Sequence, residues 1–236
     1  MHAQKIGLLL ASLLAVSAPA FSLGVFERPV TLAGNVIPHP SAAPDFSLSD
    51  QHGLPFHMAD SKGKVVVMSF IYTHCTDLCP FISMKLKSAL NLLGKDADKA
   101  VFLAVTTDPD RDTQKVIAAY SKAVGLFDSW HFLTGPMATV KDVWFNYGVG
   151  VDIQKSDDTM ASDSGSAVDA PEPTEGLSPA EADLARTVAV TFGGGYDVSH
   201  AAPFWIIDRQ GRIRVFLDAD AKPSDIAADV RALMNR

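Results

Sequence analysis

Long apolar runs mark the predicted strands of this chain. Residues 65–72 (VVVMSFIY) and 100–108 (AVFLAVTTD) are rich in β-branched residues and show no regular polar alternation. Runs of this kind are typical of strands that are buried on both faces. Residues 203–217 (PFWIIDRQGRIRVFL) hold two further apolar runs joined by DRQG, which predicts a hairpin. We expect shorter strands at 46–53, as half of an N-terminal edge hairpin, and at 130–135.

Apolar residues at helical spacing follow several of these strands. The expected helices cover residues 78–93, 114–124, 136–148 and 223–235. Glycine follows the first two, as is common after a helix end, and proline opens the third at its first helical position. This order predicts an α/β domain of the thioredoxin-like class, with a mixed central sheet flanked by helices.

The first residues have the layout of a secretory signal peptide. A basic start with Lys5 precedes an apolar run, and Ala18-Pro19-Ala20 fits an A-x-A cleavage site. The run is shorter than the roughly 20 apolar residues that a membrane-spanning helix needs. We therefore assign residues 1–20 to a signal peptide and expect an exported, periplasmic protein. An uncleaved leader would instead anchor the protein in the inner membrane.

The remaining chain is interpreted as a linker and one domain. Residues 21–43, rich in Pro, Gly and small residues, are the linker, and residues 44–236 are the thioredoxin-like domain. Residues 155–187 carry eight acidic residues and few aromatics, a composition that favours a flexible insertion between two strands. A docking surface for a basic partner is the alternative. Ser178 and Glu181 have capping-box spacing and predict a short helix at about residues 179–186.

Charge and cysteine content narrow the function. A formal net charge of −7 gives no indication of a basic surface for nucleic acid. Only two cysteines are present, Cys75 and Cys79, although disulfides persist where exported proteins work. A domain of this length buries enough apolar surface to fold without a disulfide. The pair is therefore a candidate for a redox or metal-binding site.

The two cysteines are predicted to lie beside a helix N-terminus. Cys75 follows a buried strand, and Pro80, which lacks an N–H group, is tolerated only in the first turn of the next helix. Thr76 or Asp77 would be the N-cap, so that Cys79 lies in the first turn, where the helix dipole favours a thiolate. The carboxyl end of the strands is also where open α/β sheets carry their sites.

Three interpretations of the pair compete. A structural disulfide closing so short a loop would add about 2 kcal/mol or less of stability. A redox couple needs only an accessible thiolate and a nearby thiol; the pair is one residue wider than C-x-x-C, and Pro203 lies near where such enzymes carry a cis-proline. A metal site needs a further ligand. Two thiolates and one imidazole would suffice for Cu(I), whereas zinc and iron–sulfur sites usually need four protein ligands.

The third ligand of a copper site would be a histidine from elsewhere in the chain. His200 ends the segment FGGGYDVSH, whose three glycines would let a loop swing onto a metal. A lone loop histidine without a partner is the alternative. His74 adjoins Cys75, but chain neighbours seldom both point at one ion, so it is expected to have an indirect supporting role at most. The other histidines fall in the leader, the linker, a surface hairpin or, as a structural residue, a short strand: His2, His39, His52, His57 and His131.

The chain resembles the Sco/SenC family of copper-handling proteins of the respiratory system. The resemblance covers most of the chain from about Ala43 and rests on GKVVVMSFIYTHCTDLCP, TTDPDRDT, YDVSH and FWIIDRQGRIRVF. It implies that Cys75, Cys79 and His200 bind Cu(I) or Cu(II), with the cysteines as a redox-active pair able to form a disulfide. The implied task is assembly of the dinuclear copper centre of cytochrome c oxidase, by copper delivery or by reduction of its cysteines. The implied partners are the copper-centre subunit of that oxidase and a periplasmic thiol reductant.

An enzyme is the alternative from another class. A periplasmic thiol–disulfide oxidoreductase, or a peroxidase, would use Cys75 and Cys79 without metal. His200 separates the two classes, because a dithiol enzyme functions without it and a three-ligand copper site does not.

The acidic residues near the site are expected to act first as helix caps. In DPDRDT, Asp112 or Thr113 would cap the following helix, and Asp77 is a cap candidate between the cysteines. A supporting or docking role for Asp108 and Arg111 is the alternative.

Overall fold

The computed structural model describes residues 31–154 and 174–235, which belong to one compact unit beginning at Thr31. The predicted signal peptide, residues 21–30 of the predicted linker and residues 155–173 of the predicted insertion lie outside the described residues. Within the described ranges, no helix has both the length and the apolar composition needed to cross a bilayer.

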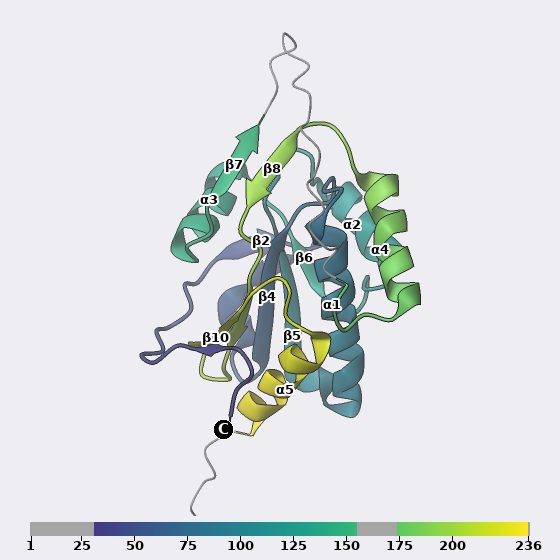
Figure 1. Ribbon diagram of the computed structural model, residues 1–236. Helices are drawn as coiled ribbons and strands as arrows, with labels where there is room; N and C mark the ends of the chain where they lie inside the picture. Colours follow the sequence, from purple (N-terminus) through teal and green to yellow (C-terminus); the bar gives the residue numbers. More distant parts are fainter. Residues whose placement is uncertain (1–30, 155–173, 236) are drawn as a thin grey trace, which may run out of the picture. The chain divides into compact units, whose positions relative to one another are not determined.

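A six-stranded mixed sheet forms the centre of the domain (Figure 1). Its strands, in spatial order, are β1 (Asn35–Val36), β10 (Ile213–Leu217), β9 (Phe204–Ile207), β4 (Val65–Ile71), β5 (Ala100–Thr106) and β6 (His131–Leu133). Strand β4 pairs in parallel with β5 and antiparallel with β9, and β5 pairs in parallel with β6. The carboxyl ends of β4, β5 and β6 therefore meet at one edge of the sheet.

Strand β4 separates two hydrophobic cores. Side chains alternate along a strand, so Val67 belongs to one core and its neighbours Val66 and Met68 to the other. The first core is covered by α1 (Leu78–Leu93), α2 (Gln114–Ala123), α4 (Pro179–Phe192) and α5 (Pro223–Met234). The second is covered by α3 (Met137–Asn146), on the other face of the sheet (Figure 1). This layering confirms the predicted thioredoxin-like class with a mixed sheet flanked by helices.

Two small sheets and two short helices complete the described fold. Strands β2 (Ser47–Ser49) and β3 (Pro55–His57) pair antiparallel, which confirms the N-terminal hairpin. Strands β7 (Val151–Gln154) and β8 (Asp197–His200) also pair antiparallel, apart from the central sheet. The short 3-10 helices are η1 (Met58–Ser61) and η2 (Gly94–Lys99).

Several details differ from the sequence-based expectations. The segment read as a linker contains β1, which pairs with β10. Helix α3 begins directly after Pro136, which occupies the N-cap position. Ser178 and Glu181 form the predicted capping box, and α4 extends to Phe192, beyond the short helix expected there. His200 ends a strand, not a free loop.

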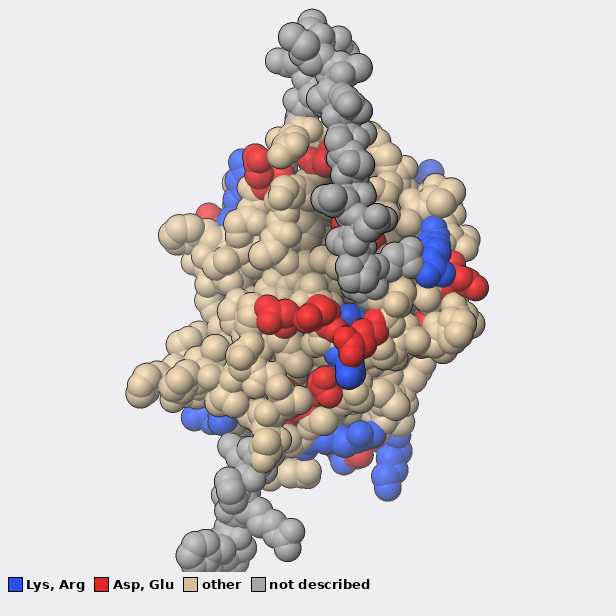
Figure 2. Space-filling view, viewed as in Figure 1, with Lys and Arg blue, Asp and Glu red and all other residues tan. Residues whose placement is uncertain are grey.

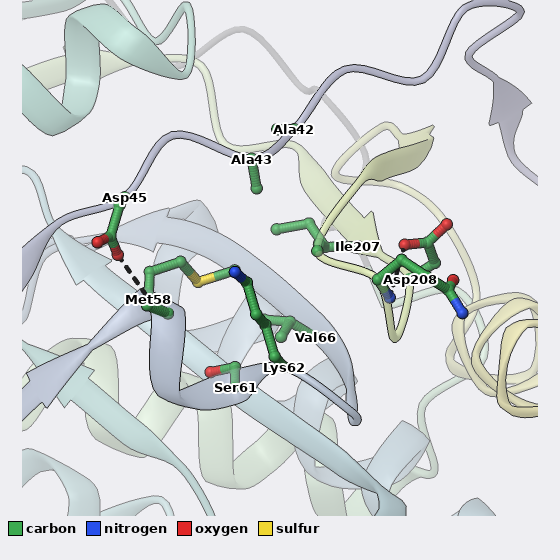
Figure 3. Close-up of a pocket in the computed structure, with 12 residues that line it drawn as sticks. Ala42, Ala43, Asp45, Met58, Ser61, Lys62, Val66, Ile207 and Asp208 are labelled. Atoms are coloured by element: carbon green, nitrogen blue, oxygen red, sulfur yellow. Dashed lines mark hydrogen bonds between the residues drawn. The ribbon is translucent and has the colours of Figure 1, made fainter.

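A cavity of about 190 Å³ lies at the amino end of β4 (Figure 3). Apolar side chains such as Met58, Val66 and Ile207 line it, and Asp45 accepts a hydrogen bond from the Ala59 backbone at its rim (2.9 Å). No cysteine or histidine is among the described residues that line it. The thiol chemistry predicted from the sequence therefore belongs to the opposite end of the strand.

Candidate thiol and metal site

The two cysteines lie at the carboxyl end of β4, on the loop into α1. Cys75 follows the strand, and Cys79 is the second residue of the helix, which begins at Leu78. A cleft of about 340 Å³ opens here. It is lined by Tyr72, Cys75, Thr76, Asp77, Leu78, Cys79, Gln154, Asp197, Val198, Ser199 and His200. The site therefore combines the end of a rigid strand, a helix N-terminus and the β7–β8 sheet.

All three predicted copper ligands border this cleft. The Cys79 sulfur lies 3.6 Å from Nε2 of His200, and the Cys79 backbone N–H donates to the Cys75 sulfur over 3.5 Å. Both cysteines are buried free thiols, and His200 is half-buried. Across residues 31–154 and 174–235, no group of three or more His, Cys, Asp or Glu side chains lies close enough together to hold a metal ion. Cys79 thus contacts each of the other two groups, Cys75 and His200.

The two thiols have opposite acidities. The hydrogen bond donated by the Cys79 thiol is the main cause that lowers the pKa of Cys75 to about 6, and the backbone N–H groups of Cys79 and Asp77 add to it. Complete burial raises the pKa of Cys79 well above its ordinary value, and the neighbouring Cys75 charge raises it further. The expectation that the helix N-terminus favours a thiolate at Cys79 was wrong, because those amides point at Cys75.

The imidazole of His200 is oriented for use as a ligand. Its Nδ1 lies 3.0 Å from the backbone oxygen of Ala201, so Nδ1 carries the proton and donates to that carbonyl. Nε2 then presents its lone pair to the Cys79 sulfur. Burial lowers the pKa of His200, which keeps the ring neutral at neutral pH. A neutral ring with a free Nε2 is the form that binds metals.

Tyr72 joins the histidine strand to the cysteine strand. Its ring meets that of His200 edge-on, with centroids 5.7 Å apart, and its hydroxyl accepts a hydrogen bond from the Val198 backbone over 3.4 Å. Burial and the nearby Cys75 charge raise the pKa of Tyr72 well above its ordinary value, so the phenol stays neutral. Sequence analysis does not predict this role, because Tyr72 has the pattern of the last apolar residue of a buried strand.

Asp112 supports the loop that carries Cys75 through contacts at the ends of β4 and β5. Its buried carboxylate accepts hydrogen bonds from the Thr73 backbone N–H (3.2 Å), the Thr73 hydroxyl (2.5 Å) and the Thr106 hydroxyl (2.6 Å). These contacts tie the ends of β4 and β5 together. Asp112 is therefore not a helix cap. Thr113 occupies the N-cap position of α2, but its side chain makes no capping hydrogen bond.

Asp108 and Arg111 connect the same edge of the sheet to the segment before β8. Asp108 is buried directly after β5, and the Arg111 guanidinium pairs with its carboxylate. The Tyr196 hydroxyl donates to the other carboxylate oxygen over 2.7 Å. The structure favours the supporting role for Asp108 and Arg111 that the sequence left as an alternative.

The structure also places the remaining candidates of the sequence analysis. His131 pairs with Asp50 (Nδ1–Oδ2 3.1 Å), which agrees with the structural role expected for it. Nδ1 of His74 lies 2.9 Å from the Thr73 hydroxyl, on the side of Asp112. Asp77 occupies the N-cap position without a capping hydrogen bond from its side chain. Pro203 follows a trans peptide bond, as do the other described residues.

The donor set fits a soft ion. Two thiol sulfurs and a neutral imidazole nitrogen border one cleft, and soft sulfur ligands favour Cu(I) over hard cations. Asp77 and Asp197 stand at the rim, with no Lys or Arg among the described lining residues. Figure 2 shows charge of both signs on the visible face: Asp and Glu lie at its upper end and centre, and Lys and Arg lie at its lower end, along its left and right edges and at its centre. The described lining of the cleft itself, acidic at its rim, suits a cation.

Comparisons with known proteins agree with this chemistry. The model of the SCO1/SenC family matches residues 36–170, which include both cysteines and more than half of the chain. The "Protein SCO2 homolog, mitochondrial" of Mus musculus is 38% identical over 78 residues, which cover 32% of this chain and 31% of that protein. The "Protein sco1" of Schizosaccharomyces pombe is 30% identical over 145 residues, which cover 59% of this chain and 52% of that protein. The chain thus spans about half or less of these relatives.

A solved structure extends the likeness to the fold. The Bradyrhizobium japonicum ScoI structure, which has copper bound, superposes with a TM-score of 0.61 at 25% identity. The superposition covers 82% of this chain and 99% of that one. It therefore reaches beyond the region that the family model matches.

Proposed function

Because the chain belongs to the SCO1/SenC family, we propose that it is an exported copper-binding chaperone that assists assembly of the dinuclear copper centre of cytochrome c oxidase. The copper ligands would be Cys75, Cys79 and His200. The single observation that carries the proposal is their placement around one cleft, with Nε2 of His200 3.6 Å from the Cys79 sulfur. The copper is cargo that is taken up and passed on.

The acidities of the groups support capture of Cu(I) near neutral pH. Cys75 is already a thiolate there, because its pKa lies at about 6. Cys79 releases its proton when the ion binds, as thiol ligands do. Nε2 of His200 needs no deprotonation. Copper would leave by exchange with thiolates of the acceptor, which the open side of the cleft allows.

The asymmetry of the thiols also supports a thiol–disulfide oxidoreductase, either as a second task or, without metal, as the alternative function. The Cys75 thiolate would attack one sulfur of an acceptor disulfide and release one acceptor thiolate. Cys79 would then pass its proton to that thiolate and attack the Cys75 sulfur. This closes a Cys75–Cys79 disulfide, releases the second acceptor thiolate and reduces the acceptor by two electrons. A periplasmic thiol reductant would restore the pair.

Anaerobic Cu(I) titration of the reduced protein against a calibrated chelator tests the proposal. We expect one copper per chain, bound about 10–100-fold more weakly in His200→Ala, since even loss of a residue that supports a metal ligand has effects of that size. His52→Ala removes an exposed histidine on the β2–β3 turn and is the matched control. Equal affinity of wild type and His200→Ala would exclude the three-ligand site. The reductase activity of the cysteine pair would then define the function.

The proposal also covers the location of the protein and its partners. We propose a periplasmic location, with the copper-centre subunit of the oxidase as acceptor. Fractionation of cells that express the full chain tests the location. Crosslinking of the copper-loaded protein to the purified subunit, with and without its own copper, tests the acceptor.

A further inference from the structure

His200 lies beside the cysteines at the end of β8, a strand that is not part of the central sheet. Among the described strands, β8 pairs with β7 alone, and these two form a separate sheet. A two-stranded sheet has little stability of its own. The position of His200 at the end of β8 therefore depends on the contacts that attach this strand to the body of the domain.

The segment that leads into β8 is intrinsically free to move. It consists of Gly193, Gly194 and Gly195, and the last two have φ angles of +114° and +83°. Glycine reaches such angles without steric penalty and loses the most conformational freedom on being fixed. Side chains or backbone groups outside the segment must therefore fix it.

Arg111, on the loop that precedes α2, holds this glycine segment in place. Its Nη1 donates to the Gly194 carbonyl over 2.9 Å, while the Gly194 N–H donates to the His74 carbonyl over 3.3 Å. A Cβ atom on Gly195 would stand 2.8 Å from Nη1 of Arg111, so a side chain at that position would displace the guanidinium. The close approach of Arg111 and the glycine backbone thus requires glycine.

Asp108 and Tyr196 are the partners that hold Arg111 from the side of the domain body. Its Nε pairs with the buried Asp108 carboxylate, and its guanidinium carbon lies 3.6 Å from the centroid of the Tyr196 ring. The Tyr196 hydroxyl donates to Asp108 over 2.7 Å. Partial burial and that carboxylate raise the pKa of Tyr196 to about 12, so the hydroxyl remains a donor. Asp108, Arg111 and Tyr196, called the clasp below, thus interlock around the start of β8.

We propose that the clasp residues Asp108, Arg111 and Tyr196 are positioning residues that hold His200 against the cysteines and thereby set how long copper is retained. The inference rests on the proposed copper function for its consequence, but its structural part does not. With the clasp open, the glycine segment moves β8, and His200 is near the thiols for a smaller fraction of the time. The apparent affinity of a site falls in proportion to the fraction of molecules that are competent to bind.

The test compares graded changes to the clasp with a matched change elsewhere. Tyr196→Phe removes one hydroxyl and keeps the ring, Arg111→Lys keeps the charge, and Arg111→Gln removes the charge. Arg212→Gln is the control, because Arg212 forms an equivalent guanidinium pair with Asp208 at the other end of the sheet. Two quantities are measured: the rate of Cu(I) release to excess chelator, and amide hydrogen exchange of residues 193–200 in the copper-free protein.

We expect release to accelerate about tenfold in Arg111→Gln and about threefold in Tyr196→Phe, with Arg111→Lys between wild type and Arg111→Gln. Exchange at 193–200 should accelerate in the same order, and Arg212→Gln should match wild type in both. Wild-type release and exchange in both Tyr196→Phe and Arg111→Gln would overturn the inference. Should wild type bind no Cu(I), the proposed function fails, and exchange alone decides: acceleration at 193–200 supports the clasp, and none overturns it.

Discussion

The two halves of the candidate site are built in different ways. The cysteines follow β4, which is buried along its whole length and hydrogen-bonded on both sides, to β5 and β9. Behind them, α1 packs in the larger core. His200 ends β8, which pairs with β7 and with no other strand in the described part of the chain, and which follows three glycines. One half is part of the core along its whole length, whereas the other half joins that core through Val198 and is otherwise half exposed.

This difference suits a site that takes up and releases an ion. In the proposed copper site, two thiols on a rigid frame would keep the affinity for a soft ion, while an imidazole on a weakly attached strand would leave first. Local stability within one domain ranges from nearly zero to that of global unfolding. Loss of the imidazole would open a coordination position for a thiolate of the acceptor without unfolding the domain. The predictions below test whether the two halves differ in this way.

The largest difference in stability is expected between removal of a carboxylate on the cysteine side, Asp112, and removal of one on the histidine side, Asp197. Asp112→Ala should lower the free energy of unfolding by about 3 kcal/mol, because it leaves the buried Thr73 N–H and two hydroxyls without their acceptor. Asp197→Ala removes an exposed carboxylate of β8 and should stay within about 0.5 kcal/mol of wild type. Urea denaturation followed by circular dichroism measures both. Equal losses in the two variants would contradict the rigid-frame account.

Amide exchange in the wild-type protein gives the second contrast. We expect amides of β8 to exchange about 100-fold faster than those of β4, which corresponds to about 2.7 kcal/mol, because β8 can open locally while β4 exchanges through global unfolding. Hydrogen–deuterium exchange with mass spectrometry resolves the two segments. The paired strand β9 serves as a second reference for the central sheet. Protection of β8 equal to that of β4 and β9 would show that the histidine half is as firmly held as the cysteine half.

The same difference explains what the sequence could predict. Continuous apolar runs betray buried strands, so residues 65–72 were predicted as a strand and the structure has β4 at Val65–Ile71. Strands β7 and β8 are four residues long and half exposed, and 42 residues separate them along the chain. So short a pattern gives no periodic signal, and their pairing depends on tertiary contacts. The central sheet apart from its short edge strand β1 was therefore predictable, and the strand that carries His200 was not.

The residues of the site also fall into those that the sequence predicts and those that it does not. Spacing placed Cys75 and Cys79 at a helix N-terminus, and resemblance to a family added His200 as the third ligand. The role of Asp112 was missed, because an acidic residue just before a helix has the pattern of a cap. Only the fold turns its carboxylate inward, to Thr73. Contacts between segments far apart in sequence, such as Asp108 with Tyr196, have no local signal at all.

A smaller effect is expected from the pH dependence of cysteine alkylation. The pKa of Cys75 is lowered to about 6, so its thiolate fraction and its reaction rate with iodoacetamide should fall as the pH drops through 6 and level off above about 7. Loss of the Cys79 thiol, the main hydrogen-bond donor to Cys75, should raise that pKa. Cys79→Ala should therefore react about tenfold more slowly at pH 6. Mass spectrometry of the modified peptide gives the rates, and a midpoint unchanged in Cys79→Ala would contradict the assigned cause.

The smallest effect concerns the helix that leads to the glycine segment. Ser178 caps α4, with its side chain on the Glu181 N–H and the Glu181 side chain on the Ser178 N–H. Ser178→Ala should lower the free energy of unfolding by about 1 kcal/mol, and Ser178→Thr, which keeps the hydroxyl, by much less. Neither should change Cu(I) release, because the cap lies at the opposite end of α4 from Gly193 and the clasp. Faster release in Ser178→Ala, measured by chelator competition, would mean that His200 is positioned by the whole of α4 and not by the contacts at the start of β8.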